Sequence, residues 1–342
     1  MTVRSRRRFV ASLTGAAAAA ITVSRALPAR AHSTGPLHHL ADHILARFAT
    51  LPGKHALCIV SPAVRGSDFE VSLNPDTALF CGSAFKAFVL AEYMRRIDAG
   101  NASVQELLTL DSNVWSLSAP VLTPYPGTLT GQINARTVLD AMISRSDNTA
   151  TDMAMNRLGV DRIREFISSI GLTGARIPDN TRKFFGYIFG DPQWETITFE
   201  QLVEFEANDP FVPNPILNDV QTMAVSPRDF VSFYSRALQG QFFTQPGTTS
   251  TFRAVLSQSE AIPRVIPLGM NAFMKGGSID FDGEHALCIA GGVFMPADRW
   301  AYFGMTMNWT DAEGGKVEDE APRFGMVAHD IFASMNQRLG TC

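Results

Sequence analysis

Residues 83–100 read SAFKAFVLAEYMRRIDAG, a strong helical pattern near the start of the chain. The pattern predicts one helix, Ser83–Ala99, which Gly100 terminates. Its middle, Phe85–Ala91, is apolar on nearly every face, so we expect the helix to run through the core. Lys86 interrupts this apolar run. Burial at that position would lower the pKa of the lysine and leave part of it as a neutral amine.

The composition of the whole chain is that of a globular protein. It has 342 residues, of which 46% are apolar and 18% are charged, which is enough to bury a sizeable core. Lys and Arg total 29 and Asp and Glu total 33, so there is no basic excess for binding nucleic acid. No apolar stretch is long enough to cross a bilayer, and no Cys/His spacing is typical of zinc. We expect no cofactor and no metal.

The first 31 residues predict an export signal. An arginine-rich start precedes a short alanine-rich run, Leu13–Val23, and then Ala29-Arg30-Ala31, which matches an A-x-A cleavage site. The stretch Ser5–Val10, SRRRFV, is typical of a twin-arginine signal. An organelle transit peptide is the alternative. Cleavage would remove six arginines and no acid, which leaves a net charge of −10. Such a protein suits a small-molecule substrate, and we expect it to be periplasmic or secreted, without a stable membrane anchor.

Strand patterns lie at both ends of the mature chain, and helical patterns lie between them. The predicted strands are 55–60, 68–74, 273–280, 285–294 and 300–308, with turns at Arg65-Gly66 and Asp282-Gly283. The other predicted helices are 37–49, 137–158 (as one or two helices), 161–170, 227–239, 250–258 and 322–338. Residues 101–136 give only short helical and loop signals, and 173–221 predict a long loop with one short helix near 199–206.

This order of elements predicts an α/β (α+β) protein. The N- and C-terminal strands would form an antiparallel sheet of about five strands, flanked by helices. A helical subdomain, about 83–262, would be inserted into the sheet subdomain. Residues 32–342 would then form one domain.

Ser83-Ala84-Phe85-Lys86 is the first of three motifs that carry chemistry. The spacing puts a hydroxyl and an amine on one face at the start of the helix, where negative charge is stabilised. A neutral amine beside a serine hydroxyl can activate it as a nucleophile. The alternative is that Ser83 only caps the helix and Lys86 reaches the surface.

The other two motifs are Ser146-Asp147-Asn148 and Lys275-Gly276-Gly277-Ser278. In the first, a hydroxyl and an amide flank an acid, which can relay a proton and bind a substrate amide. The alternative is a capping cluster at a helix boundary. In the second, a lysine and two glycines open a predicted strand, so a substrate backbone can approach its edge closely. The alternative is a lysine that guards an edge strand.

Together and in this order, the three motifs resemble the signature set of class A β-lactamases and penicillin-binding proteins. The resemblance covers about residues 37–338. It implies a β-lactamase/transpeptidase-like fold, an acyl-enzyme mechanism, a monomer, and a small-molecule β-lactam or D-Ala-type peptide as substrate.

The resemblance also implies a role for each motif residue. It makes Ser83 the nucleophile, Lys86 its base, Ser146 the proton donor to the leaving nitrogen, Asn148 the ligand of the substrate side-chain amide, Lys275 the partner of the substrate carboxylate, Gly277 part of the substrate-binding strand, and the N–H groups of Ser83 and Ser278 the oxyanion hole.

Two departures from the family pattern affect the expected chemistry. Gly276 stands where the family usually has a hydroxyl, which removes one hydrogen bond to a substrate carboxylate. The best match to the omega-loop segment E-x-x-L-N is Asn214–Asn218, with Asn214 at the position of the glutamate. Asparagine cannot take a proton from water, so this departure predicts fast acylation and slow deacylation.

The chain between Ser146 and this loop is also longer than usual in the family. It contains four acids that could supply the missing base, Glu195, Glu200, Glu204 and Glu206. The alternative for all four is a solvated helix face.

Three functions therefore stay open on the sequence alone. They are a β-lactamase-like serine hydrolase, a D-Ala-type peptidase or esterase, and a β-lactam-binding or biosynthetic-cluster protein on the same fold. The four cysteines are too few for a disulfide scaffold. Cys58 and Cys288 lie in strand-like runs and are expected to be buried thiols.

Overall fold

The computed structural model describes residues 30–31, 36–64, 68–118, 121–122, 129–296 and 298–339. The predicted export signal, apart from its last two residues, lies outside these ranges, as do the predicted turn at Arg65-Gly66 and Cys342. No helix in the described part of the chain is long and apolar enough to cross a membrane.

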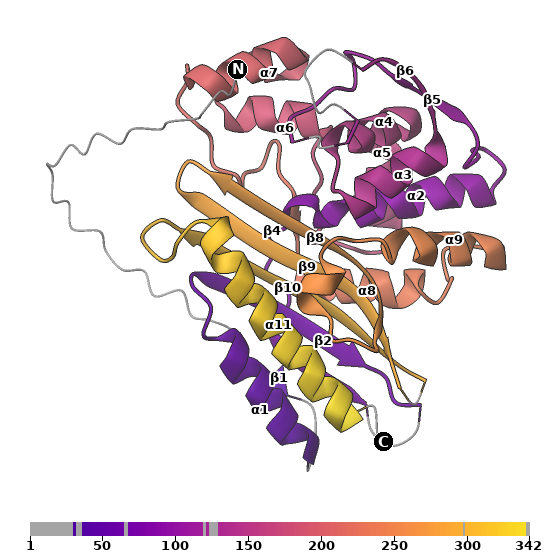
Figure 1. The fold of residues 1–342 in the computed structure, drawn as a ribbon, viewed down its shortest axis with the longest axis vertical. Helices are drawn as coiled ribbons and strands as arrows, with labels where there is room; N and C mark the ends of the chain where they lie inside the picture. Colours follow the sequence, from indigo (N-terminus) through magenta and orange to yellow (C-terminus); the bar gives the residue numbers. More distant parts are fainter. Residues whose placement is uncertain are drawn as a thin grey trace, which may run out of the picture.

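One antiparallel sheet organises the fold, with the strand order β1-β3-β2-β10-β9-β8 (Figure 1). Its strands are β1 (Arg30–Ala31), β2 (Lys54–Ser61), β3 (Phe69–Leu73), β8 (Asn271–Phe281), β9 (Glu284–Met295) and β10 (Arg299–Thr310). Since β1 has only two residues, the sheet has five full strands, which confirms the predicted α/β fold. The chain closes the sheet where N-terminal β2 pairs with C-terminal β10.

The hairpin between β8 and β9 is tight. Asp282 and Gly283 connect the strands, and both have positive φ, 45° and 75°. That is the backbone of a two-residue hairpin, and Asp-Gly is a preferred sequence for it. The predicted turn is confirmed, and β8 is left as an edge strand with one free side.

Two helices from opposite ends of the chain cover one face of the sheet, α1 (Pro36–Phe48) and α11 (Val317–Leu339) (Figure 1). Phe324, Val327, Ile331 and Met335 of α11 follow helical spacing and are buried against the strands. On the other face, α8 (Pro227–Ala237) packs against β2, β9 and β10.

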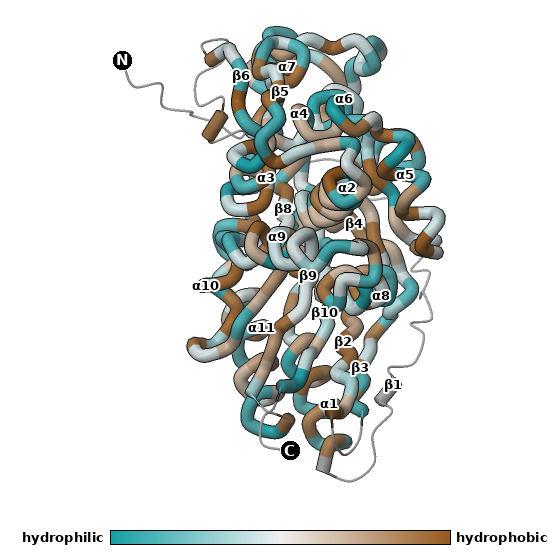
Figure 2. The backbone as a smooth tube through the Cα atoms, turned by 90° about the vertical axis from the view of Figure 1, so that its right-hand side faces the viewer, coloured by the Kyte–Doolittle hydropathy of each residue, from teal (hydrophilic) through white to brown (hydrophobic). Residues whose placement is uncertain are grey.

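The middle of the chain forms the helical part. Its remaining helices are α2 (Lys86–Asp98), α3 (Ala135–Ser144), α4 (Asn148–Leu158), α5 (Val160–Ser169), α6 (Thr181–Ile188), α7 (Phe199–Asn208), α9 (Pro246–Leu256), α10 (Ile262–Val265), and the 3-10 turns η1 (Gly82–Phe85) and η2 (Trp194–Thr196). Figure 2 shows the outer helices α5 and α7 alternating between hydrophilic and hydrophobic colours, as expected of helices with one buried face.

Helix α2 is the centre of the helical part. Every residue from Lys86 to Met94 is buried, so the prediction that this helix runs through the core is confirmed. The predicted Ser83–Ala99 helix begins as the 3-10 turn η1. Ser83 lies in this turn, before the regular helix α2 begins at Lys86.

Two regions differ from the sequence prediction. Residues 101–136 contain a two-stranded ribbon of β5 (Leu107–Leu110) and β6 (Gly131–Asn134), where only short helical and loop signals were expected. A second small ribbon pairs β4 (Leu79–Phe80) with β7 (Ala224–Val225).

The second difference is α6, because the prediction for residues 173–221 was a long loop with one short helix. The short helix near 199–206 is confirmed as α7. The sequence of α6, TRKFFGYI, has two phenylalanines, a tyrosine and a glycine, which are weak helix formers. Its helical state rests on the cap at Asn180, which accepts from the Lys183 N–H, and on burial of its inner face, so tertiary packing decides it.

Candidate active site

The turn η1 presents Ser83 beside the edge of β8. Gly82 precedes it with φ of +52°, a conformation that glycine adopts without strain. A Cβ atom on Gly277 would lie 2.1 Å from the carbonyl oxygen of Cys81 and 2.6 Å from the nitrogen of Ser83. A Cβ atom on Gly82 would lie 2.8 Å from the nitrogen of Ser278. The two glycines therefore let the N–H groups of Ser83 and Ser278 lie in one corner.

Lys86 begins α2 and is fully buried. Its Nζ donates to Asn148 Oδ1 at 2.6 Å and to the carbonyl oxygen of Ser146 at 2.7 Å. Burial, and then the charge of Lys275, lower the pKa of Lys86 well below its ordinary value, although nearby carboxylates oppose the shift. Lys86 does not reach the surface, and its burial disfavours the charged form, as the role of a base requires.

Lys275 of β8 reaches Ser146 from the other side. Its Nζ donates to Ser146 Oγ at 3.0 Å and to the carbonyl oxygen of Gly276 at 2.8 Å. Burial lowers the pKa of Lys275 to about 8, against the opposing effect of Glu260. Ser146 has φ of +57°, which is uncommon for a residue other than glycine and is found more often at functional sites. The loop between α3 and α4 thus turns the Ser146 hydroxyl toward β8.

Asp147 lies between the two functional candidates of its motif and has a positioning role. Its carboxylate accepts from the N–H groups of Val121 at 3.0 Å, Leu122 at 2.8 Å and Ala150 at 2.8 Å. It therefore caps α4, as the capping alternative stated, and also holds the segment at 121–122. This anchoring fixes where Ser146 and Asn148 lie on either side of it.

The side-chain amide of Asn148 makes most of its hydrogen bonds within the protein. Its Oδ1 accepts from Lys86 and its Nδ2 donates to the carbonyl oxygen of Leu117 at 2.9 Å. An amide nitrogen carries two N–H groups, so one of them is left for a substrate. Asn148 lines the cleft at Ser83, where such a bond would form.

A buried acid behind Asn148 was missed by the sequence reasoning. Asp152 accepts from the Thr181 N–H and hydroxyl, both at 2.8 Å, and from the Arg182 N–H at 3.1 Å. Burial raises the pKa of Asp152 to about 6. The carboxylate joins α4 to the N-terminus of α6. The signal in the sequence is its position, four residues after Asn148 and so on the same helix face.

Asn214, the residue matched to the omega-loop glutamate, is bonded to the end of α6. Its Nδ2 donates to the carbonyl oxygen of Tyr187 at 2.8 Å, and its backbone N–H donates to the carbonyl oxygen of Ile188 at 2.9 Å. Its neighbour Pro213 lines the cleft. Of the four acids named as alternative bases, Glu206 lines the cleft. All four are exposed.

Two hollows meet at Ser83. The larger, about 1090 Å³, also takes in Ser146, Asn148 and several phenylalanines. The smaller, about 150 Å³, contains Ser146 and the first residues of the Lys275 motif, together with Glu260 and Arg264. Arg264 lies on α10, and neither it nor Glu260 belongs to a motif, so no sequence pattern indicated these two residues.

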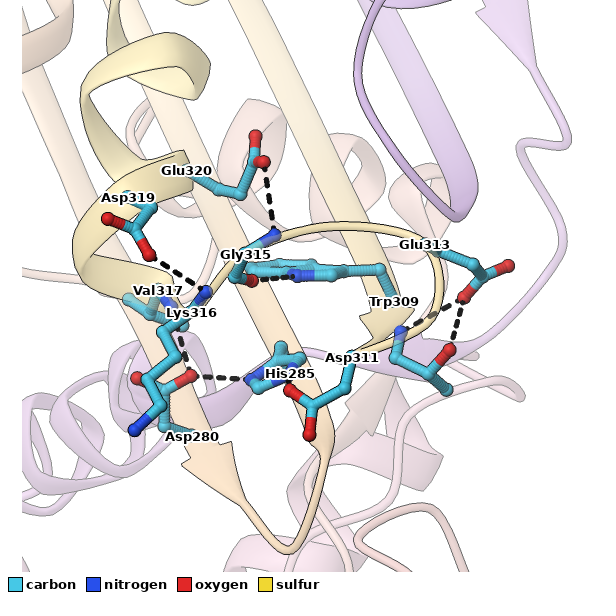
Figure 3. A network of polar contacts seen from close by, with 11 residues as sticks. Asp280, His285, Trp309, Asp311, Glu313, Gly315, Lys316, Val317, Asp319 and Glu320 are labelled. Atoms are coloured by element: carbon cyan, nitrogen blue, oxygen red, sulfur yellow. Dashed lines mark hydrogen bonds and ion pairs between the residues drawn. The ribbon is translucent and has the colours of Figure 1, made fainter. Parts of the chain in front are cut away.

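The end of β8 beside the cleft is anchored by His285, which is only 3% exposed. Its Nδ1 lies 2.5 Å from Asp280 Oδ1, and its Nε2 lies 2.8 Å from Asp311 Oδ1 (Figure 3). The ring stacks on Trp309, with centroids 5.2 Å apart. Asp280 also accepts from the Val317 N–H at 2.9 Å, so the end of β8 is tied to β10 and to α11.

The three cysteines that the structure describes do not offer a second nucleophile. Cys58, Cys81 and Cys288 are buried and free, as expected for Cys58 and Cys288. Burial raises the pKa of Cys58 and of Cys288 to about 12, and that of Cys81 well above its ordinary value, so each stays a thiol. Within the ranges that the structure covers, no three His, Cys, Asp or Glu residues are grouped as a metal site would require.

Comparisons with known proteins place this geometry in a family. Residues 40–317 match the model of a beta-lactamase enzyme family. A search of curated proteins found no match.

Solved structures with the same fold include beta-lactamases and a penicillin-binding protein. A beta-lactamase from Chitinophaga pinensis has 17% sequence identity and a TM-score of 0.67, with 88% of this chain and 99% of that chain covered. A class A beta-lactamase from Bacteroides cellulosilyticus has 16% identity and a TM-score of 0.66, with 89% and 100% covered. PBP-A has 18% identity and a TM-score of 0.65, with 92% and 100% covered.

At these identities the structural similarity establishes the fold and not the activity. The family model covers most of the chain, from the first helix through the last strand. With Ser83, Lys86, Ser146 and Lys275 brought together at one corner of that fold, the chain belongs to the beta-lactamase enzyme family.

Proposed function

We propose that this chain is a serine hydrolase that opens β-lactam rings through an acyl-enzyme. One observation carries the proposal. Ser146 lies between two buried lysines, with its carbonyl oxygen bonded to Lys86 and its hydroxyl bonded to Lys275, next to the turn that bears Ser83.

Each group has a step in the proposed reaction. Ser83 Oγ attacks the lactam carbonyl while Lys86 Nζ takes its proton. The N–H groups of Ser83 and Ser278 stabilise the negative charge that forms on the carbonyl oxygen. The C–N bond then breaks, and Ser146 gives its proton to the leaving nitrogen. The proton that Lys86 took from Ser83 restores the Ser146 hydroxyl, and Lys275, hydrogen-bonded to Ser146, keeps its charge and faces the substrate carboxylate.

The electrostatics support a neutral Lys86 beside a charged Lys275. Both amines are buried, and each charge disfavours the other, so the first proton is lost readily. A pair coupled in this way titrates as a unit, with Lys86 as the member farther below its ordinary pKa. The base and the carboxylate-binding cation can therefore coexist near neutral pH.

Slow deacylation is part of the proposal. In the acyl-enzyme, water needs a base, and Asn214 has its amide bonded to Tyr187 and has no proton-accepting group to offer. Loss of a general base costs about 10²–10⁴-fold in rate. Glu206 is the acid among the four candidates that lines the cleft, and we propose it as the residue to test for residual turnover.

A D-Ala-type peptidase or esterase is the second candidate. Two observations favour it, the fold shared with PBP-A and an asparagine where the hydrolytic glutamate is expected. Such an enzyme has no need for rapid β-lactam turnover. It would be acylated by a penicillin and would turn over a peptide or an ester faster.

A time course of intact-protein mass spectrometry tests these proposals. The mature protein is mixed with benzylpenicillin, and we expect an adduct of the full penicillin mass that forms within seconds and decays slowly. The Ser83→Ala variant is the control and should stay unmodified. A parallel assay follows D-Ala release from a D-Ala-D-Ala peptide.

The outcomes separate the candidates. Decay of the adduct with release of opened penicillin supports the hydrolase. Faster peptide than penicillin turnover supports the second candidate, and a permanent adduct without turnover indicates a binding protein. No adduct and no turnover of either substrate would contradict the acyl-enzyme mechanism.

We also propose that the first 31 residues export the folded protein through the twin-arginine route. Arg6→Lys together with Arg7→Lys should keep the protein in the cytoplasm of a bacterial host, whereas the unaltered chain should be found outside the cytoplasmic membrane and begin at His32. Equal export of both would contradict this route.

A further inference from the structure

The larger hollow at Ser83 is lined on one side by phenylalanine side chains. They come from β4, from α6, from α7 and the segment after it, and from the tip of β8. The seven are Phe80, Phe184, Phe185, Phe189, Phe199, Phe211 and Phe281. Leu117, Val203 and Ile279 add to this apolar lining.

Five of these rings form a continuous series, which we call the aromatic wall: Phe80, Phe184, Phe185, Phe189 and Phe281. Successive ring centroids lie 5.7, 5.3, 6.2 and 5.7 Å apart. The series runs from the strand just before the nucleophile turn, along α6, to the tip of the β8–β9 hairpin. Its first two rings are buried and its last three are half-buried, so the latter offer apolar surface to the cleft.

The aromatic wall is held in place at several points. Asp152 fixes the first residues of α6, and Asn214 fixes the last turn through the carbonyl oxygen of Tyr187. The hairpin that carries Phe281 is anchored through His285 (Figure 3). A surface formed before the substrate arrives loses little conformational entropy on binding.

The second hollow at Ser83 is much smaller, and both polar and apolar side chains line it. It is about 150 Å³ and contains Lys275, Glu260 and Arg264. An acylating substrate has two parts, the acyl group that stays on Ser83 and the leaving group that departs. Ser146 lines both hollows, but Lys275 lines only the smaller one. Because the leaving nitrogen or oxygen must face Lys275, the acyl side faces the larger hollow, whose size is in the range of drug-sized ligand sites.

We propose that the aromatic wall binds a large apolar group on the acyl side of the scissile bond. The preferred substrates are then esters or lactams with long aliphatic or aryl acyl groups, and small acyl groups are poor. The charged residues of the same hollow, among them Arg145 and Glu206, lie outside the aromatic wall. The inference rests on the proposed acylation of Ser83 and adds the class of acyl group. Half-buried apolar surface that a substrate covers should raise the acylation rate roughly two- to fourfold per added methylene.

The test is a series of p-nitrophenyl esters, from acetate through butyrate and hexanoate to octanoate, all below their micelle concentrations. Initial rates of p-nitrophenolate release give kcat/KM for acylation. In the mature protein we expect octanoate to exceed acetate by at least about 60-fold, because six added methylenes each contribute roughly two- to fourfold. Equal values across the series, or a fall with length, would overturn the inference.

Variants place the effect on the aromatic wall. Phe185→Ala and Phe189→Ala should each lower the octanoate-to-acetate ratio about tenfold, as expected for lost apolar contact alone. Phe185→Leu should keep most of the ratio. Phe242→Ala is the matched control, since Phe242 is also half-buried but packs against Phe166, Phe233 and Arg236 away from the cleft.

The ratio separates this inference from the proposed function. A misfolded Phe185→Ala variant would lose the rates with both octanoate and acetate, so its ratio could not be measured. Phe185→Leu, which keeps a large apolar side chain, then tests the aromatic wall. If no ester and no penicillin acylates Ser83, the proposed function fails and the inference fails with it. If esters acylate Ser83 but Phe185→Ala and Phe242→Ala change the ratio alike, only the role of the aromatic wall is overturned.

Discussion

On one side of Ser83, two buried lysines flank the half-buried Ser146: Lys86 donates to its carbonyl oxygen at 2.7 Å, and Lys275 donates to its hydroxyl at 3.0 Å. On the other side, half-buried phenylalanines of α6 and β8 face a hollow of about 1090 Å³. The polar side depends on particular atoms at fixed distances. The aromatic side depends on shape and apolar surface, which many side chains can provide. A substitution can therefore change the polar side of the cleft and leave the aromatic side intact, or the reverse.

The largest effect is expected for Lys86→Met, which removes the proposed base and keeps the length of the side chain. Acylation by benzylpenicillin should fall about 10²–10⁴-fold, as for loss of a general base. The aromatic side should stay intact, so non-covalent binding of a long-chain ester product should be unchanged. Stopped-flow acylation and binding titrations measure the two effects.

Lys316→Met is the control, because Lys316 is exposed and lies far along the chain in the turn before α11. It should acylate like the unaltered protein. Acylation of the Lys86 variant at the normal rate would show that Lys86 is not the base.

Gly277→Ala should break the corner where the two N–H groups meet. The added Cβ would lie 2.1 Å from the carbonyl oxygen of Cys81, so β8 must move away from η1. Loss of one oxyanion donor typically costs about 10²–10³-fold in rate. Gly247→Ala is the control, since nothing lies within 4 Å of a Cβ atom there. Similar acylation rates for the two variants would contradict the proposed oxyanion hole.

The pH profile of acylation tests the electrostatics of the polar side. Burial lowers the pKa of Lys275 to about 8, and the pKa of Lys86 lies well below its ordinary value. The rate should rise with pH as Lys86 loses its proton, and fall above about pH 8 as Lys275 loses the charge that faces the substrate carboxylate. An uncharged ester should lack the alkaline decline. A penicillin rate that stays flat from pH 7 to 9.5 would contradict this assignment.

The smallest effect is expected for His285→Gln, which loosens the hairpin that carries Phe281. The change removes contacts of a buried ring with Asp280 and Asp311, and the free energy of unfolding should fall by about 1–3 kcal/mol. The octanoate-to-acetate ratio should fall a few-fold, because Phe281 belongs to the aromatic wall. His39→Gln, at an exposed position of α1, should change neither quantity. Denaturant unfolding and the ester series check both.

The sequence predicted the members of the polar side because each of the three motifs is local, although the motifs meet only in the folded chain. The spacing of Ser83 and Lys86 places them on one helix face, and the apolar residues around Lys86 predict its burial, which the structure confirms. The five full strands follow from apolar runs of strand length that turn residues bound, and the Asp282-Gly283 turn follows from turn preferences. These features need only neighbours in the chain.

The features that the sequence did not predict arise between distant segments. Helix α6 is composed of weak helix formers and exists because Asp152 and Asn214 hold its two ends. Arg264 and Glu260 join the small hollow only when α10 is brought beside β8. Likewise, no local pattern predicts that Phe80 and Phe281, some 200 residues apart in sequence, belong to one series of rings.

The sequence by itself determined the sheet, the buried helix α2, and the three motifs that place this chain in its family. Each of these follows from the spacing of nearby residues, because that spacing sets the direction of a side chain on its helix or strand. Only the tertiary structure decided how close β8 lies to Ser83, which acid supports α6, and how the cleft divides into a polar and an aromatic side. Those properties depend on contacts between elements far apart in the chain, and packing alone determines which elements meet.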